Sequence, residues 1–217
     1  MIIPLPKSAD TNNPKIIALC KSISKDSDPL YLDVEMIDGT IPNECYENVE
    51  KMISNNGGEI QYGWQIWETL PGVMAEAEFH AVWKNPDGQL KDISFKKNKV
   101  SKILFVEDLA LVYTGNQVNN VRLNLFPDMV VDHFIETCDI LFKLSNKGDR
   151  ARLYGQAFVN SLTPEQLAKQ QEVTIYKQVL MKFLNDGGNE DSPCFCDSGQ
   201  KYKNCHARVM PKLRTVD

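Results

Sequence analysis

Three of the six cysteines in this 217-residue chain lie in its last two dozen residues, together with a histidine. They are spaced as Cys194-Phe-Cys196, eight intervening residues, and then Cys205-His206. A segment this short cannot bury a hydrophobic core of its own, so it needs another source of folding energy. Three thiolates and one imidazole complete a tetrahedral ligand set for Zn²⁺ and leave no position for a reactive water molecule. The sequence therefore predicts one structural zinc ion held by Cys194, Cys196, Cys205 and His206, whose binding folds the tail.

The charge of this tail differs from that of the rest of the chain. The whole chain has 24 basic and 29 acidic side chains, a formal charge of -5 at pH 7. From Asp191 to Asp217 there are five basic and three acidic side chains, or +2, so the other 190 residues carry -7. An acidic chain has no general affinity for a polyphosphate backbone, so nucleic acid is not the expected partner. A basic tail on an acidic body suits an acidic protein surface instead.

The residues around the four expected ligands resemble a known motif. They read Ser192-Pro-Cys-Phe-Cys-Asp-Ser-Gly-Gln-Lys-Tyr-Lys-Asn-Cys-His206. This run resembles the SEC-C motif, the zinc-binding tail of the preprotein translocase ATPase SecA, whose usual form is Pro-Cys-Pro-Cys-Gly-Ser-Gly-Lys-Lys-Tyr-Lys-x-Cys-His-Gly. The differences are Phe195 for proline, Asp197 for glycine, Gln200 for lysine and Ala207 for the last glycine, and none of them removes a ligand.

The resemblance implies a protein-binding use of the tail. In SecA this tail contacts the export chaperone SecB and is associated with the ribosome, and it recurs on many bacterial proteins, so the resemblance implies a bacterial origin and a SecB-like chaperone or the ribosome as partner. It covers about fifteen of the 217 residues. The chain has no phosphate-binding G-x-x-x-x-G-K-[ST] loop and is far too short for that motor, so the resemblance implies an adaptor or accessory protein with a zinc-binding tail.

The first residues, Met1-Ile-Ile-Pro-Leu-Pro-Lys-Ser8, hold two prolines and no apolar stretch of signal-peptide length. No later segment approaches the roughly 20 apolar residues of a membrane span. We therefore expect a cytoplasmic protein, in which cysteines are thiols, metal ligands or catalytic groups more often than disulfides.

Apolar periodicity and turn residues predict an α+β fold, an antiparallel sheet with packed helices. Helices are expected over 16–23, from 43 to about 54, over 129–144 and over 163–184, and strands over 30–36, 60–67, 74–83, 89–93, 102–106 and 121–126. The polar, glycine-bearing segment 186–193 is expected to be a linker between a body (1–185) and a small C-terminal zinc module (194–217).

A second candidate site lies in the expected body. Asn43 is a plausible N-cap, so Cys45 would lie in the first turn of a helix, where the dipole favours a thiolate. A reactive thiolate needs a partner imidazole, and His80, on an expected strand, is the best candidate. His133 is expected on the solvated side of a helix, and His206 is an expected metal ligand.

The turn Asn85-Pro-Asp-Gly88 predicts which residues of the hairpin lie next to His80. Proline cannot take the positive φ of a type I′ turn, so a type I turn with Gly88 in the left-handed region should pair Asn85 with Gln89. That register places His80 opposite Ser94, with Asp92 one step away on the same face of the hairpin. Cys45, His80 and Asp92 would then form a catalytic triad. This layout resembles papain-like and transglutaminase-like cysteine enzymes.

Other interpretations of these residues stay open. Glu76, Glu78 and His80 alternate along one strand face, which also suits a second metal site. His80 can equally be a hydrogen-bonded strand residue, with Cys45 buried against the sheet. Two functions follow: an adaptor that binds proteins through its zinc tail, or a cysteine-dependent hydrolase or transferase acting on amide or thioester bonds.

Overall fold

The computed structural model describes residues 5–97, 99–153 and 155–214, in two compact units. The first, here called the sheet unit, comprises Leu5–Thr114 and Asn120–Leu125. The second, the helical unit, comprises Gly115–Asn119 and the chain from Phe126 onward. The mixture of helices and antiparallel strands confirms the α+β fold. None of the helices in the described ranges is long and apolar enough to cross a membrane.

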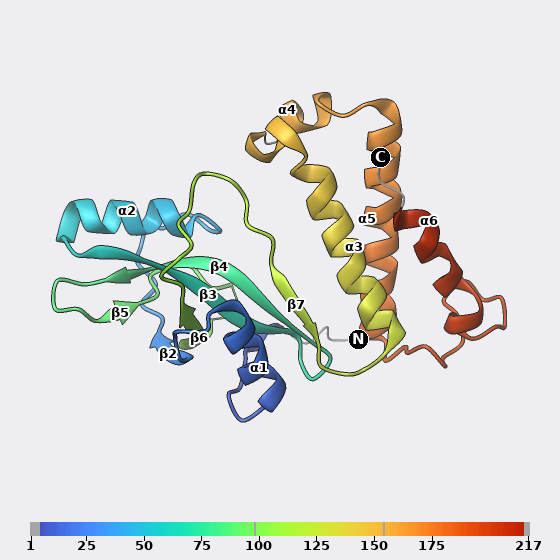
Figure 1. The fold of residues 1–217 in the computed structure, drawn as a ribbon, viewed down its shortest axis with the longest axis horizontal. Helices are drawn as coiled ribbons and strands as arrows, with labels where there is room; N and C mark the ends of the chain where they lie inside the picture. Colours follow the sequence, from blue (N-terminus) through green and yellow to red (C-terminus); the bar gives the residue numbers. More distant parts are fainter. Residues whose placement is uncertain (1–4, 98, 154, 215–217) are drawn as a thin grey trace. The chain divides into compact units, whose positions relative to one another are not determined.

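Seven strands form one antiparallel sheet in the sheet unit (Figure 1). The strand order is β2-β6-β3-β4-β5, with β1 added to β3 and β7 added to β4. The strands are β1 (Lys7–Ser8), β2 (Leu30–Asp33), β3 (Glu59–Leu70), β4 (Met74–Lys84), β5 (Leu90–Lys91), β6 (Lys102–Glu107) and β7 (Val121–Asn124).

The two long central strands, β3 and β4, present a polar stripe on one face of the sheet. Successive side chains of a strand point to opposite faces, so every second residue shares a face. Gln65 and Trp67 of β3 therefore lie on one face of the sheet. In the pairing of β3 with β4, Gln65 lies opposite Glu78 and Trp67 lies opposite Glu76. His80 is on the same face as Glu78, two residues further along β4.

The turn after β4 has the predicted register. The Asn85 amide donates to the Gln89 carbonyl (2.9 Å), and the Gly88 amide donates to the Asn85 carbonyl (2.8 Å). Gly88 has a φ of 82°, the left-handed conformation that the type I turn requires at this point. Beyond β5 the chain leaves β4, and Asp92 forms a parallel bridge with Val34, so the expected pairing of His80 with Ser94 is wrong.

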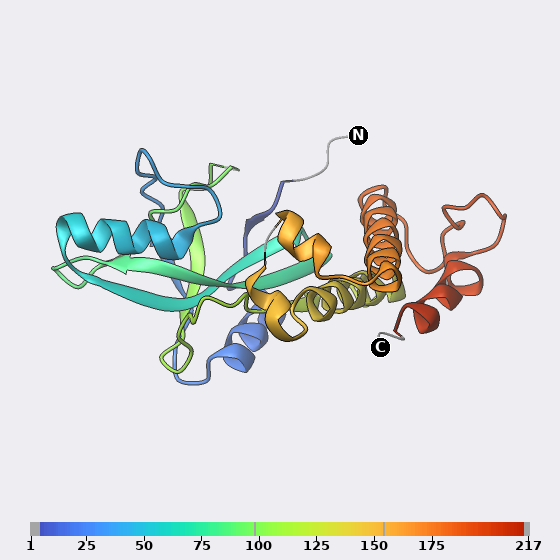
Figure 2. The ribbon, with the colours of Figure 1, turned by 90° about the horizontal axis from the view of Figure 1, so that it is seen from above.

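Two helices belong to the sheet unit. In α1 (Pro14–Ile23), the Asn13 side chain accepts a hydrogen bond from the Lys15 amide and so caps the helix. Helix α2 (Cys45–Asn56) packs on β4 and β3 (Figures 1 and 2). The expected N-cap of α2 is wrong by one residue: Glu44 is the cap residue and its side chain does not cap, whereas Asn43 has a φ of 66°.

The sheet unit has a hydrophobic cluster on each face of the sheet. One cluster brings α2 onto the sheet and contains Cys45, Val49, Ala81 and Ile93. The other contains Leu32, Val82, Ile103 and Phe105. Because Ala81 and Val82 are neighbours on β4, alternation places the two clusters on opposite faces.

The helical unit is built on the antiparallel helices α3 (Met129–Ser145) and α5 (Pro164–Asn185), which lie side by side (Figures 1 and 2). Asp128 caps α3, and a capping box between Thr163 and Gln166 begins α5. The 3₁₀ turn Gly148–Arg152 and the helix α4 (Gly155–Asn160) come between them, and the 3₁₀ turns Tyr202–Asn204 and His206–Val209 and the helix α6 (Met210–Arg214) follow α5.

The segment 186–193, expected to be a linker, is held by hydrogen bonds to the start of α3. The Glu190 amide donates to Asp128 Oδ2 (3.0 Å), and Glu190 Oε2 accepts from the Met129 amide (3.2 Å). Contacts therefore group the C-terminal tail with α3 and α5 in one compact unit.

A glycine in β3 allows β6 to pack closely beside it. A Cβ atom at Gly63 would lie 2.3 Å from the Val106 carbonyl oxygen and 2.4 Å from the Phe105 ring, too close for any real contact. We expect Gly63→Ala to lower the free energy of unfolding of the sheet unit by about 3 kcal/mol, because backbone and a buried ring must both move. Urea denaturation followed by circular dichroism measures this, and a loss under about 0.5 kcal/mol would contradict the close packing.

Candidate functional site

Two predicted metal ligands, Cys194 and Cys196, lie on a tight hairpin of the tail, and Cys205 and His206 follow it at the 3₁₀ turns. The Cys194 amide donates to the Gln200 carbonyl (2.8 Å), which closes the turn between them. The turn contains Asp197 and Gly199, both with positive φ (55° and 74°). Glycine adopts this conformation freely and aspartate tolerates it better than most residues, so Asp197 can replace the glycine usual in the motif.

The four ligand atoms are close enough to share one metal ion. Cys194 Sγ and Cys205 Sγ lie 3.1 and 3.5 Å from His206 Nδ1, and Cys196 Sγ lies 3.6 Å from Cys205 Sγ. All four atoms lie within 4.8 Å of one another. Zn–S bonds of about 2.3 Å and a Zn–N bond of about 2.0 Å give tetrahedral edges of about 3.5–3.8 Å, so the set suits a zinc ion.

Two residues of the motif stabilise the metal site, Ser198 through the sulfurs and Phe195 through α5. The Ser198 hydroxyl lies 3.4 Å from Cys205 Sγ. Hydrogen bonds from Ser198 also lower the pKa of Cys196, which favours the thiolate that a metal needs. Phe195, which stands where the motif usually has proline, packs its ring against Phe183 of α5, with ring centroids 5.5 Å apart. This substitution therefore attaches the metal hairpin to the helix.

A buried hydrogen-bond chain joins the tail to α3 and α5. His133 Nδ1 lies 2.7 Å from the Tyr202 hydroxyl, which lies 3.1 Å from the Tyr176 hydroxyl, and Tyr176 donates to the carbonyl of His206 (2.9 Å). The single hydroxyl proton of Tyr176 goes to His206, so Tyr202 donates to Tyr176 and His133 donates to Tyr202. His133 is thus buried and bonded to the tail, and its expected solvated position is wrong.

Ion pairs within the helical unit neutralise part of the positive charge of the tail. Lys201 and Lys203 each lie 2.8 Å from the carboxylate of Asp191. Arg214 forms a bidentate ion pair with Glu136 of α3. The local excess of positive charge is therefore smaller than the composition suggests.

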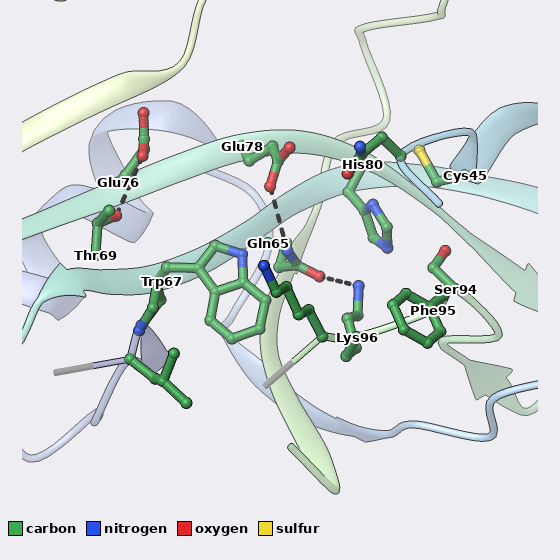
Figure 3. A pocket seen from close by; sticks show the side chains of 14 residues that line it. Cys45, Gln65, Trp67, Thr69, Glu76, Glu78, His80, Ser94, Phe95 and Lys96 are labelled. Atoms are coloured by element: carbon green, nitrogen blue, oxygen red, sulfur yellow. Dashed lines mark hydrogen bonds between the residues drawn. The ribbon is translucent and has the colours of Figure 1, made fainter. Parts of the chain in front are cut away.

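The second candidate site lies in the sheet unit, and its three predicted residues come together. His80 Nε2 lies 3.1 Å from Asp92 Oδ1, although the ladder between β4 and β5 ends before either residue. Cys45 is the first residue of α2, and its side chain lies next to the His80 ring (Figure 3). All three side chains are buried, and Asp92 is completely so.

Lys96, which the sequence reasoning did not single out, also belongs to this cluster. Its ammonium group lies 2.7 Å from Asp92 Oδ2 and donates to Gln65 Oε1 (2.6 Å). Gln65 in turn donates to Glu78 (3.3 Å). One buried carboxylate is thus shared by two cationic side chains, His80 and Lys96.

The charges of this cluster are strongly perturbed. Burial alone would lower the pKa of His80, and Lys96 acts in the same direction, but Asp92 and the neighbouring Cys45 outweigh them and raise the pKa of His80 to about 9. Burial would raise the pKa of Asp92, but His80 and Lys96 hold it well below its usual value. The His80 ring is therefore charged at neutral pH.

A cavity of about 360 Å³ opens along the polar stripe of the sheet and ends at this cluster (Figure 3). Its thiol end is formed by Cys45, His80 and Ser94. Gln65, Trp67, Glu78 and Lys96 line its middle. This volume accommodates a small ligand or a single amino-acid side chain.

The alternative of a second metal site at Glu76, Glu78 and His80 has no support in the geometry. Glu76 pairs with Arg122 at 2.8 Å, and the ring of His80 bonds to Asp92. Within the described ranges, the ligand atoms of three or more histidine, cysteine or acidic residues gather closely only at the Cys194 cluster.

Comparison with known proteins identifies the tail. Residues 192–208 match the family model described as the SEC-C motif. No curated protein and no solved structure matches the chain significantly. The chain therefore carries a SEC-C motif whose Cys194, Cys196, Cys205 and His206 can bind a metal ion.

Proposed function

We propose that the tail is a structural zinc module through which the protein binds other proteins, as an adaptor or accessory protein. The observation that carries this is the closed set of three thiols and one imidazole, which suits zinc and leaves no open position for catalysis. Arg208 is exposed on this module, and we find no ion pair for it among the described residues. A SecB-like chaperone or the ribosome is the partner that the resemblance to the motif suggests.

Binding to a purified SecB-type chaperone and to purified ribosomes tests this proposal. We expect the chain to bind one of them, Cys205→Ser to lose that binding because the module cannot close, and Arg208→Glu to weaken it by about tenfold. Lys25→Glu is the matched control, since Lys25 is an exposed lysine of the sheet unit, and it should bind normally. Equal binding by Cys205→Ser would contradict a role for the zinc module.

A second candidate function is thiol-dependent chemistry in the sheet unit, and we infer it from the cavity that ends at Cys45 and at His80, which is bonded to Asp92. A charged imidazole next to a thiol favours the thiolate, and a carboxylate on the other ring nitrogen fixes its orientation. The same three groups carry out acyl transfer in other folds. The inferred reaction is hydrolysis or transfer of an amide or thioester.

The roles of the residues follow from their positions. The Cys45 thiolate would attack the carbonyl carbon, giving a tetrahedral intermediate. The bond to the leaving group then breaks, and His80 donates its proton to that group. Water attacks the acyl-enzyme, His80 takes the proton of this water, and the acid and the Cys45 thiolate are released. Asp92 positions His80 throughout, and Lys96 positions Asp92.

The direct test of this second function is the alkylation rate of Cys45 together with thioester hydrolysis. A thiol that is buried and unreactive in the native chain would rule it out.

A further inference from the structure

We propose that the Ser94 hydroxyl binds the carbonyl oxygen of an acyl group held at Cys45, so that the thiol end of the cavity is an oxygen-binding site for acyl substrates. This inference rests on the proposed thiol function and assigns Ser94 a catalytic role within it. Three independent observations support it.

The first observation is the Ser94 hydroxyl itself. Ser94 lines the cavity beside His80, the residue is 6% exposed, and its hydroxyl oxygen is buried. Its Oγ has no hydrogen-bond partner in the part of the chain that the structure describes. A buried hydroxyl without a hydrogen-bond partner costs free energy. Such a hydroxyl beside a cavity therefore indicates a ligand atom that forms the missing hydrogen bond.

The second observation is the start of α2. Glu44 makes no side-chain cap, and the first intrahelical hydrogen bond runs from the Asn48 amide to the Glu44 carbonyl (3.0 Å). The amides of the first turn, which begins at Cys45, therefore have no acceptor within the helix. These amides and the helix dipole favour negative charge near the thiol.

The third observation is the charge balance of the buried cluster. Asp92 supplies one negative charge, whereas Lys96 and the charged His80 ring supply two positive charges. In the proposed thiol function, the sulfur of Cys45 carries the negative charge that balances this cluster before the reaction. When its sulfur has bonded to a carbonyl carbon, that charge moves to the substrate oxygen, which needs donors close to the sulfur.

The position of Ser94 follows from the neighbouring backbone. Its amide donates to Asp92 Oδ1 (3.0 Å), the same oxygen that lies 3.1 Å from His80 Nε2. Ser94 is thus fixed to the carboxylate that orients His80, while its buried hydroxyl has no partner among the described residues. Figure 3 shows Ser94 at the thiol end of the cavity, with Cys45 and His80.

A small aldehyde tests this site in the full chain. The thiolate adds to the carbonyl carbon of propanal, a C–S bond forms, and the former carbonyl oxygen takes the negative charge and then a proton. The hemithioacetal so formed resembles the tetrahedral intermediate of acyl transfer. Its affinity is measured by the protection of Cys45 from iodoacetamide, an alkylation that creates no oxyanion.

We expect Ser94→Ala to weaken the affinity for propanal by at least about tenfold. The alkylation rate without aldehyde should stay within about twofold of wild type, and the unfolding temperature should be equal or higher, because an unpartnered hydroxyl has been removed. Ser54→Ala is the matched control, since the Ser54 hydroxyl bonds within α2 to the Glu50 carbonyl, and it should change none of these quantities.

Three outcomes would overturn the inference. If Ser94→Ala slows alkylation as much as it weakens propanal binding, Ser94 only positions the thiol. If wild-type Cys45 is alkylated rapidly but propanal gives no protection, the thiol function stands without an oxygen-binding site. If wild-type Cys45 is not alkylated, the proposed thiol function fails and this inference fails with it.

Discussion

Replacing Cys205 by serine is expected to unfold residues 194–214 while leaving the sheet unit intact. Tyr202, Met210 and Leu213 of the tail are buried, but the hairpin that carries the thiols has no core of its own, so the proposed zinc ion should supply much of the folding energy of the tail. A structural zinc site supplies about 10–16 kcal/mol to such a segment, which is more than the total stability of many domains. Serine is a far poorer zinc ligand than a thiolate, so the closed set of four ligands is lost.

Amide hydrogen exchange measures this effect residue by residue. We expect the amides of 194–214 to lose their protection, together with part of the protection of α3 and α5 near His133 and Tyr176, because Tyr202 joins the tail to both helices. The amides of β3 and β4 should exchange at wild-type rates. A zinc chelator should give the same pattern in the wild-type chain.

Cys138→Ser is the matched control for this experiment. Cys138 is buried in α3 of the same unit and is not one of the four ligands, so its replacement should leave the tail protected. Full protection of the tail in Cys205→Ser would contradict a structural metal. Full protection of α3 and α5 would support our sequence-based boundary at 194, whereas loss of protection in β3 and β4 would show that the two units unfold together.

The sequence predicts the larger elements of this fold well, because long amphipathic segments and turn residues are strong local signals. The strand expected over 60–67 is β3, and the helix expected over 129–144 is α3. The shorter elements β1, α4 and α6 were not predicted. They have only two to six residues, so their conformation depends on contacts with distant parts of the chain rather than on local periodicity.

The two sites differ in how far the sequence could predict them. The metal ligands are close together in the sequence, and the spacing of the motif brings them together. The turn after β4 fixes the pairing only as far as Trp83 with Lys91, so it brings Asp92 near β4 but does not itself pair Asp92 with His80. Lys96 could not be placed in the same way, because the chain leaves the ladder after β5 and no register extends to it. The bond between His133 and Tyr202 joins residues 69 positions apart, for which the sequence has no signal.

Replacing His80 by glutamine is expected to slow the alkylation of Cys45 at pH 7 by at least about tenfold and thioester hydrolysis by about 10²–10⁴-fold. In the proposed thiol function, the charged ring stabilises the thiolate in both reactions, and in hydrolysis it also transfers protons. Glutamine keeps a hydrogen-bonding side chain next to Asp92, and Lys96 still pairs with that carboxylate, so the sheet unit should remain folded. Mass spectrometry of peptides after timed iodoacetamide treatment measures the rate at each cysteine.

Cys20 is the internal control, because it lies in the same unit but is buried in α1, and this burial raises its pKa to about 11. It should react slowly in both proteins. Cys45→Ser should lose the fast modification and the hydrolysis together. Similar rates at Cys45 and Cys20 in the wild-type chain would rule out the thiol function.

The pH dependence separates an electrostatic role of His80 from a steric one. The pKa of His80 in the folded chain, about 9, lies above the ordinary value of 6.5, so the ring keeps its positive charge as the pH rises through neutrality and loses it near pH 9. The difference in alkylation rate between wild type and His80→Gln should therefore be large at pH 7 and should shrink above pH 9, where neither protein has a charged ring. A ratio of rates that is the same at pH 7 and at pH 10 would contradict the electrostatic role, because a change in packing alone does not depend on the protonation of the ring.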